Sequence, residues 1–236
     1  ARAPLAAVLK LWEGLGYYAR ARNFHKAMGI VVAQYDGRIP DQWEPFRALP
    51  GVGDYIAAAV LSIAFGRPFA VVDGNVKRVL ARLWCIDLPV NVPRHHADYQ
   101  RHAGRLLDHN APSDFNQALM EIGALVCRPR TPRCEHCPLK DACCARADGQ
   151  TDRYPLRLSR GRTPLQQLAV AVIQRRGKLL LTRRPESGLL GGLWEFPNAV
   201  RPAGESPDDT CRRLARDQVG LVVSPRAHIA QIRHAY

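Results

Sequence analysis

The stretch from residue 49 to residue 73, LPGVGDYIAAAVLSIAFGRPFAVVD, decides the fold of this chain. Gly51 and Gly53 form a tight turn, because glycine adopts backbone angles that other residues disfavour. The alanine-rich apolar run 55–65 follows and predicts a buried helix. Since the first amides of a helix have no partner inside it, the turn offers N–H groups to an anion such as a phosphate.

Asp73 ends this stretch and directly precedes a second helical pattern over residues 74–84. A carboxylate that follows a phosphate-binding turn suits chemistry on a sugar of the DNA backbone. The alternative is an ordinary hairpin of two helices in which Asp73 only caps the second one. In that second helix we expect apolar residues to face inward (Val76, Val79, Leu80, Leu83) and basic ones to face solvent (Lys77, Arg78, Arg82).

Composition points to a globular protein with a polyanionic partner. The chain has 236 residues, of which 47% are hydrophobic, which allows two domains with real cores and excludes general disorder. The net charge of +13 makes nucleic acid the first candidate partner. An anionic membrane surface would also suit this charge, but no basic amphipathic helix and no apolar run long enough to span a bilayer is evident. We expect a monomer without a membrane partner.

The cysteines carry the most specific pattern. Cys127, Cys134, Cys137 and Cys143 are separated by six, two and five residues. Four thiolates in one short loop can bind Zn²⁺ or an iron–sulfur cluster. Structural zinc usually shows two paired-cysteine knuckles, whereas only one pair is present here, so the spacing favours a 4Fe-4S cluster.

The other cysteines have no such pattern. Cys144 is a spare that could compete with Cys143 as a ligand, and we expect Cys85 and Cys211 to be core residues. The odd count of seven, crowded into one loop, argues against a secreted disulfide scaffold and for a metal site in a reducing cytoplasm. We therefore expect a cytoplasmic, bacterial, nucleoid-associated protein.

The periodicity divides the chain into two domains and a linker. Residues 1–144 predict a helical domain that carries the cysteine loop 127–143, and residues 145–165 are polar and basic, as in a linker. Residues 166–236 predict a small α/β domain, with strands at 168–174, 179–182 and 193–196, a helix at 207–219 and an extended piece at 222–223. Near the N-terminus Tyr17 and Arg20 combine an aromatic ring with a cation. They suit base stacking and phosphate contacts, or equally a half-buried helix with a solvated face.

Four segments resemble the endonuclease III superfamily of helix-hairpin-helix DNA glycosylases, and within it the adenine DNA glycosylases of the MutY type. These segments are GLGYYARARN (14–23), LPGVGDY (49–55), VDGNVKRVLAR (72–82) and FNQALMEIGALVC (115–127). The resemblance implies an all-α glycosylase domain with a 4Fe-4S loop, followed by an α/β Nudix-like domain. Because the chain begins at Ala1 without Met and stops at Tyr236 inside an expected strand, we expect both ends to be truncated.

The resemblance also implies a reaction and its residues. The enzyme would be a hydrolase that cleaves the N-glycosidic bond of adenine opposite 8-oxoguanine or guanine in double-stranded DNA. Asp73 would stabilise positive charge on the sugar, with Tyr55 orienting it. Leu15 and Tyr17 would enter the duplex near the lesion, where Arg20 would add a phosphate contact, and the turn residues would hold a phosphate (Gly51, Val52, Gly53).

Two departures from the family pattern bear on activity. Lyase members carry a lysine nucleophile where this chain has Tyr55, so we expect a monofunctional glycosylase. The family's glutamate acid lies upstream of Ala1, and Glu13, Glu44 and Glu121 do not occur in its motif. We therefore expect this chain alone to be nearly inactive, since losing a general acid costs on the order of 10²–10⁴ in rate.

The second domain departs from a working Nudix hydrolase, which needs a helix rich in glutamates to hold Mg²⁺. The corresponding segment, CRRLARDQ (211–218), holds one carboxylate and three arginines. Its implied task is recognition of the opposing 8-oxoguanine, with His234 and Tyr236 at the start of a recognition loop. Two alternatives stay open: a bifunctional glycosylase that also cleaves abasic sites, and a catalytically silent iron–sulfur module that binds DNA.

Overall fold

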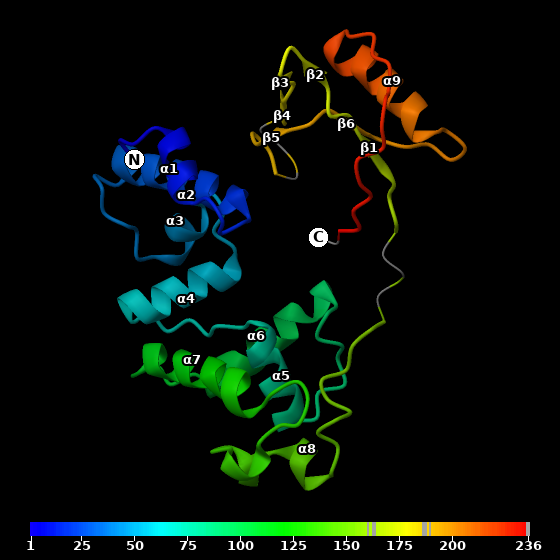
Figure 1. Cartoon of the computed structure of the whole chain (residues 1–236). Helices are drawn as coiled ribbons and strands as arrows, with labels where there is room; N and C mark the ends of the chain where they lie inside the picture. The colour runs from blue at the N-terminus through cyan, green and yellow to red at the C-terminus, as the bar shows by residue number, and fades with distance from the viewer. Residues whose placement is uncertain (160, 162–163, 186–187, 189, 235–236) are drawn as a thin grey trace. The chain divides into compact units, whose positions relative to one another are not determined.

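The computed structural model describes residues 1–159, 161, 164–185, 188 and 190–234. The chain folds as two units (Figure 1). One comprises Ala1–Gly14 and Arg20–Arg160, and the other comprises Leu15–Ala19 and Gly161–Tyr236. Each is described by itself. No helix in the described part of the chain is both long and apolar enough to cross a membrane.

The first unit is helical, as the sequence predicts. Its first four helices are α1 (Leu5–Leu11), α2 (Tyr18–Gln34), α3 (Trp43–Arg47) and α4 (Asp54–Phe65). They are followed by α5 (Gly74–Leu83), α6 (His96–Leu106), α7 (Pro112–Glu121) and the short α8 (Cys144–Ala147). Between α7 and α8 lie the π-helical turn η2 (Ile122–Val126) and two 3₁₀ turns, η3 (Cys134–His136) and η4 (Lys140–Ala142).

The glycine turn of the opening stretch joins α3 to α4. Gly51 has a φ of +81°, in the left-handed region, and a Cβ there would lie 2.7 Å from Cβ of Asn23 in α2. Glycine is therefore required at this position both by the backbone angle and by the close approach. Helix α4 then begins at Asp54 and ends at Gly66, whose φ of 64° terminates it.

Two apolar clusters stabilise the first unit. One packs α2, α3 and α4 together (Ala27, Val31, Phe46, Leu49, Ala57, Leu61). The other packs α5 against α6 and α7, around residues such as Leu80 and the fully buried Tyr99. Helix α4 also packs on α7, so the two clusters belong to one body.

A buried amide links α4 and α7 to the segment that ends in Asp73. The Asn116 side chain donates to Ser62 Oγ at 3.0 Å and to the carbonyl of Phe69 at 2.8 Å. Its carbonyl oxygen accepts from the Val71 amide at 2.9 Å. Asn116 is only 1% exposed, so these bonds satisfy backbone groups that water does not reach. They position the extended segment 69–72, which leads to Asp73.

The predicted linker differs from the structure over residues 145–158, which pack on the helical unit. Helix α8 and the residues after it pack on the first unit: the Val90 amide donates to the carbonyl of Leu156, and Asn91 exchanges two hydrogen bonds with Leu158. Tyr154 is 3% exposed. Hydrogen bonds to its backbone hold this polar, aperiodic segment in place. Hydrophobic periodicity does not report such bonds, so the sequence pattern resembled a linker.

In its described residues the second unit contains short antiparallel strand pairs and one helix. β1 (Leu168–Val170) pairs with β6 (Asn198–Val200), β2 (Gln174–Arg175) with β3 (Lys178–Leu179), and β4 (Thr182–Arg183) with β5 (Trp194–Glu195). The predicted strand 168–174 divides into β1 and the start of a hairpin whose turn is Arg176–Gly177, both with positive φ. The sequence did not predict β6. Among the described residues no strand includes Val222 or Val223, where we expected one.

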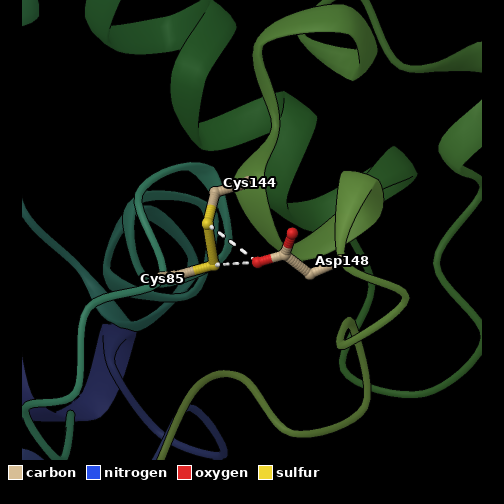
Figure 2. Close-up of side chains that lie close together, drawn as sticks. All are labelled: Cys85, Cys144 and Asp148. Carbon is tan, nitrogen blue, oxygen red and sulfur yellow. Dashed lines mark hydrogen bonds between the residues drawn. A yellow bond between two sulfur atoms is a disulfide. The ribbon is translucent and has the colours of Figure 1, made fainter.

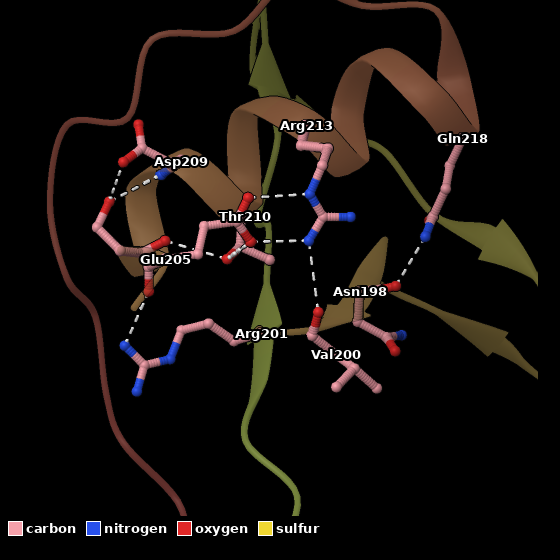
Figure 3. A network of polar contacts seen from close by, with 9 residues as sticks. Asn198, Val200, Arg201, Glu205, Asp209, Thr210, Arg213 and Gln218 are labelled. Atoms are coloured by element: carbon pink, nitrogen blue, oxygen red, sulfur yellow. Dashed lines mark hydrogen bonds and ion pairs between the residues drawn. The ribbon is translucent and has the colours of Figure 1, made fainter. Parts of the chain in front are cut away.

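Helix α9 (Pro207–Val219) matches the predicted range and packs on β1 and β6. Ser206 caps its start and Gly220 ends it with a φ of 67°. A polar network connects it to β6 (Figure 3). The Glu205 carboxylate accepts from Thr210 Oγ1 at 2.7 Å and from Arg213 Nε at 3.0 Å and Nη2 at 2.8 Å. These bonds from Arg213 and Thr210 lower the pKa of Glu205 to about 2.

We predict that Asn116→Ala lowers the free energy of unfolding of the first unit by about 2–4 kcal/mol, because it leaves a buried carbonyl and a buried amide unsatisfied. Gln117→Ala removes the same type of side chain one residue further along α7, where it is exposed, and we expect a change within about 0.5 kcal/mol. Denaturant unfolding monitored by circular dichroism measures both. Equal effects of the two changes would contradict the role of Asn116.

We also predict that Glu205 makes the stability of the second unit pH-dependent. Its folded-state pKa of about 2 lies below the ordinary value of 4.5, so the unfolded chain takes up the proton first. The stabilisation is therefore complete above pH 4.5 and is lost as the pH falls toward 2. Amide hydrogen exchange in α9 should show Glu205→Gln to be less protected than wild type near neutral pH, with the difference shrinking below pH 4.5.

Asp208→Asn, a change at an exposed acid of the same helix, serves as the control. A constant difference between Glu205→Gln and wild type across this pH range would contradict the assignment.

Candidate functional site

The candidate catalytic carboxylate lies at the N-terminus of α5. Asp73 is the N-cap of this helix, and its Oδ1 accepts from the Val76 amide at 2.7 Å. Its Oδ2 accepts from the Asn75 side-chain amide at 3.2 Å. The capping role considered as an alternative is thus present in the structure. It occupies one oxygen with a helix amide and leaves the other with a single side-chain donor.

Two of the three basic residues of α5 are buried, and the third is half-buried, contrary to the prediction that all three face solvent. Arg78 and Arg82 are 6% and 2% exposed, and the Lys77 ammonium donates to the carbonyl of Val90 at 3.3 Å. Helix α5 is enclosed by the cysteine loop as well as by the apolar core, so it has no fully solvated face between residues 78 and 83. Burial lowers the pKa of both Lys77 and Arg78.

Arg78 connects the Asp73 end of the helix to the cysteine loop. Its Nη2 donates to Asn75 Oδ1 at 2.8 Å and to the carbonyl of Gly123 at 2.6 Å, and its Nε donates to the carbonyl of Cys127 at 2.7 Å. Asn75 in turn donates to Asp73. Gly123 is needed at this contact, because a Cβ there would lie 2.7 Å from Cβ of Asn75. A continuous set of hydrogen bonds therefore runs from the carboxylate to the first predicted cluster ligand.

Arg82 holds the loop itself. Its Nε donates at 2.9 Å to the carbonyls of Thr151 and Tyr154, and its Nη1 donates at 2.8 Å to that of Arg128. Its Nη2 donates to the carbonyl of Pro129 at 3.2 Å, and Nη1 also lies 3.4 Å from Cys127 Sγ. The sequence reasoning did not identify Asn75, Arg78 or Arg82 as site residues. Their four-residue spacing places Arg78 and Arg82 on one face of a helix, but the carbonyls that bind them lie 45 to 72 residues away, so no local pattern signalled their role.

The four predicted cluster ligands are brought together. Cys127, Cys134, Cys137 and Cys143 are free thiols that line one small cavity with Arg82, Arg133 and Lys140. Burial raises the pKa of the Cys134 and Cys137 thiols, and the nearby sulfurs of Cys127 and Cys143 raise it further. Four thiolates at these positions therefore need a bound cation or cationic cluster to offset burial and mutual repulsion.

The spacing of the sulfurs fits a cluster better than one ion. No three of these four sulfur atoms, all within the described residues, lie within 4.8 Å of one another. Four thiolates on one tetrahedral zinc ion would be about 3.8 Å apart. The donor set of four thiols around one cavity thus fits an iron–sulfur cluster.

The remaining cysteines differ from the sequence expectation. Cys85, predicted to be a lone core residue, forms a disulfide with Cys144, predicted to be a spare in the loop. The two are 59 residues apart, so no sequence spacing could indicate the pairing. Cys211 is free and half-buried, in α9.

The structure does not join Tyr55 to Asp73. Tyr55 is 45% exposed in the first turn of α4, and no hydrogen bond connects it to Asp73 in the described part of the chain. In the turn before it, Arg47 donates to the carbonyl of Val52 at 2.7 Å and pairs with Asp54 at 2.6 Å. The amides of Gly51 and Gly53 have no hydrogen-bond partner among the described residues, so they are free to bind an anion.

The predicted DNA-contacting side chains are exposed. Leu15 and Tyr17 are 62% and 80% exposed, and Tyr17 has a positive φ of 46°. Arg20 lies over the ring of Trp12, 5.6 Å from its centroid, so part of its cation is directed at an aromatic face. His234 is exposed at the end of the described chain, and Tyr236 lies outside the described residues.

Two family models match the chain. Residues 1–94 match the model described as HhH-GPD superfamily base excision DNA repair protein, and residues 169–236 match the NUDIX domain. The chain is 37% identical to the adenine DNA glycosylase of Arabidopsis thaliana, over 88% of this chain and 35% of that protein. It is 33% identical to the human adenine DNA glycosylase, over 100% of this chain and 52% of that protein. The chain thus spans between a third and about half of the length of these relatives.

Solved structures of two DNA repair enzymes share the fold over part of this chain. A thermostable thymine-DNA glycosylase matches with a TM-score of 0.57 and 32% identity, over 62% of this chain and 68% of that one. Endonuclease III in a trapped covalent intermediate with DNA matches with a TM-score of 0.53 and 26% identity, over 62% of this chain and 68% of that one.

We predict that Arg82→Met loosens the cysteine loop, because it leaves several buried carbonyls without a donor at a cost on the order of 3 kcal/mol. Amide hydrogen exchange of residues 127–154 should become faster, while exchange in α2 stays unchanged. Arg101→Met is the matched control, since Arg101 is exposed and pairs only with Asp98 in α6. Unchanged exchange of residues 127–154 in Arg82→Met would show that the loop does not depend on this guanidinium.

Proposed function

Because this chain belongs to the HhH-GPD superfamily of base excision DNA repair proteins, we propose that it forms the glycosylase part of a DNA repair enzyme. That enzyme would hydrolyse the N-glycosidic bond of adenine opposite 8-oxoguanine or guanine in double-stranded DNA. The relatives named adenine DNA glycosylases, at 33% and 37% identity, support the choice of base. The observation that carries the proposal is the position of Asp73, which is fixed at the N-terminus of α5 and linked through Asn75 and Arg78 to the cysteine loop.

Asp73 is suited to stabilise charge on the sugar. Breaking the glycosidic bond of an adenine that has left the stack builds positive charge on the deoxyribose ring. A helix N-terminus favours negative charge, and the hydrogen bonds from Val76 and Asn75 fix the carboxylate in one orientation. Within the described part of the chain Oδ2 accepts only from Asn75, at 3.2 Å, so it is the oxygen that would face the sugar.

The glycine turn and the exposed N-terminal residues would position the DNA. The amides of Gly51 and Gly53 would bind a phosphate next to the extrahelical nucleotide, with Val52 between them. Exposed Leu15 and Tyr17 would wedge into or stack on the base pairs. The net charge of +13 supports a polyanionic partner of this kind.

Tyr55 supports a monofunctional reaction. A lyase needs an amine that attacks the sugar to form a Schiff base, and Tyr55 has a hydroxyl at the position of the family's lysine. Lys77 is the nearest lysine in sequence, and its ammonium is bound to the carbonyl of Val90. A protein–DNA adduct trapped by borohydride would contradict this part of the proposal.

The four cysteines would hold a 4Fe-4S cluster. Bound there, the cluster would supply a rigid, four-thiolate support for a loop rich in cations, including Arg133 and Lys140, that can contact phosphates. Arg82 would stabilise the thiolate of Cys127 from the protein side.

The second unit would recognise the opposing base, as the resemblance implies, with His234 in that role. In α9 Arg213 is bound to Glu205 and Arg212 to Asp209, so these arginines are part of the fold of the unit. The helix lacks the glutamates that hydrolysis of a nucleoside diphosphate with Mg²⁺ would require. We propose further that the protein is a monomer in the cytoplasm.

The alternative of a silent DNA-binding module is tested at Asp73. We predict that Asp73→Asn lowers the single-turnover rate of adenine release from an A:8-oxoguanine duplex by about 10²–10³-fold or more, because it removes the charge opposite the sugar. Asparagine caps helices as well as aspartate does, so the fold and the DNA affinity should be preserved.

Asp108→Asn is the control, since Asp108 also accepts backbone amides, from Asn110 and Ala111, but lies in the loop before α7. The rates are best compared in a protein that carries the family's glutamate acid, because Glu13, Glu44 and Glu121 do not occur in the motif of that acid. Equal rates for Asp73→Asn and wild type would show that the carboxylate does no chemistry.

A further inference from the structure

A second group of metal-ligating side chains lies beside the cysteine loop, apart from its four free thiols. Cys85 follows the end of α5, Cys144 begins α8, and Asp148 directly follows α8 (Figure 2). One carboxylate oxygen of Asp148 and the two sulfurs all lie within 4.8 Å of one another. The three residues come from two helices that pack on each other, so their positions are fixed by the fold.

The Asp148 carboxylate is directed at the two sulfurs. Its Oδ2 lies 3.5 Å from Cys144 Sγ and 3.9 Å from Cys85 Sγ (Figure 2). In the described part of the chain no lysine, arginine or histidine forms an ion pair with Asp148. A disulfide sulfur has no proton to donate. The Asp148 carboxylate can therefore accept hydrogen bonds from these cysteines only when they are thiols, or share a cation with them when they are thiolates.

The group is separate from the cluster ligands although Cys143 and Cys144 are adjacent. Cys143 lines the cavity of the free thiols and donates to the carbonyl of Arg82 at 3.4 Å. Cys144 does not line that cavity. The adjacent residues Cys143 and Cys144 therefore belong to two different sites.

We propose that Cys85, Cys144 and Asp148 form a redox-gated site for a thiophilic divalent cation such as Zn²⁺, closed by the disulfide and opened by its reduction. The Cα–Cα distance of Cys85 and Cys144 is 5.8 Å, which suits a disulfide and also two thiolates on one tetrahedral ion. Two thiolates and one carboxylate are ligands that zinc accepts, with water in the fourth position. All three residues are at least partly exposed, so reductant and ion can reach them.

The steps balance with a dithiol as reductant. A dithiol transfers two electrons and two protons to the Cys85–Cys144 disulfide, which becomes two thiols while the dithiol becomes its own disulfide. The divalent cation then replaces the two thiol protons, which are released to solvent. A small-molecule disulfide reverses the process: it takes two electrons from the two thiolates and two protons from solvent to become two thiols, while the Cys85–Cys144 bond forms and the divalent ion is released.

The test counts bound metal in the two redox states of the whole chain. Protein is prepared oxidised or reduced by a dithiol that is then removed, and Co²⁺ and Zn²⁺ are titrated in, with thiolate-to-cobalt absorption and zinc content as readouts. We expect reduced wild type to bind one more equivalent than oxidised wild type and than reduced Cys85→Ser. Reduced wild type and reduced Cys85→Ser both keep the four loop thiols in the same redox state, so the contribution of these thiols cancels in that comparison.

Two further variants sharpen the result. Asp148→Asn leaves the disulfide possible and should weaken the additional ion by about tenfold or more, since even groups that only support a ligand contribute 10–100-fold to metal affinity. Cys211→Ser, which removes a free cysteine of α9, should behave as wild type. Equal metal content in reduced wild type and reduced Cys85→Ser would overturn the site. Absence of a peptide linking residues 85 and 144 after oxidation would overturn the gate.

Discussion

The burial of two arginines in α5 is the constraint on which the rest of the helical unit depends. A guanidinium removed from water must find acceptors for its donors, and most acceptors of Arg78 and Arg82 are backbone carbonyls of the loop between Gly123 and Tyr154. Apolar contacts of Cys127 and Leu139 with the core also hold the loop. Together these interactions fix its shape, and four of its cysteines line one cavity.

The same helix joins structure to proposed chemistry. Its N-terminus carries Asp73, its middle carries the two arginines, and its C-terminal end is followed by Cys85. The hydrogen bonds from Asp73 through Asn75 and Arg78 to Cys127 connect the carboxylate to the cysteine loop. A cofactor held by that loop would thus support the position of the carboxylate.

Charge is used differently in the second unit. There Glu205, just before α9, and Arg213, within it, bind each other. Glu205 also accepts from the Thr210 hydroxyl, and Arg213 also donates to the carbonyl of Val200. In α9 Arg212 forms an ion pair with Asp209, and Arg213 forms one with Glu205. The unit shares the NUDIX family match but places cations and internal ion pairs where metal-binding carboxylates would be needed for hydrolysis.

The sequence by itself determined the local features: the glycine turn before α4, the bounds of α9, the helical class of the first unit, and the four cysteines of one site. Each depends on residues close together in the chain, where glycine angles, caps and hydrophobic period decide. Only the tertiary structure decided that Arg78 and Arg82 point inward, that Cys85 pairs with Cys144, and that residues 145–158 belong to the helical unit. The physical reason is that these outcomes depend on carbonyls and sulfurs 45 to 72 residues away, which no local pattern encodes.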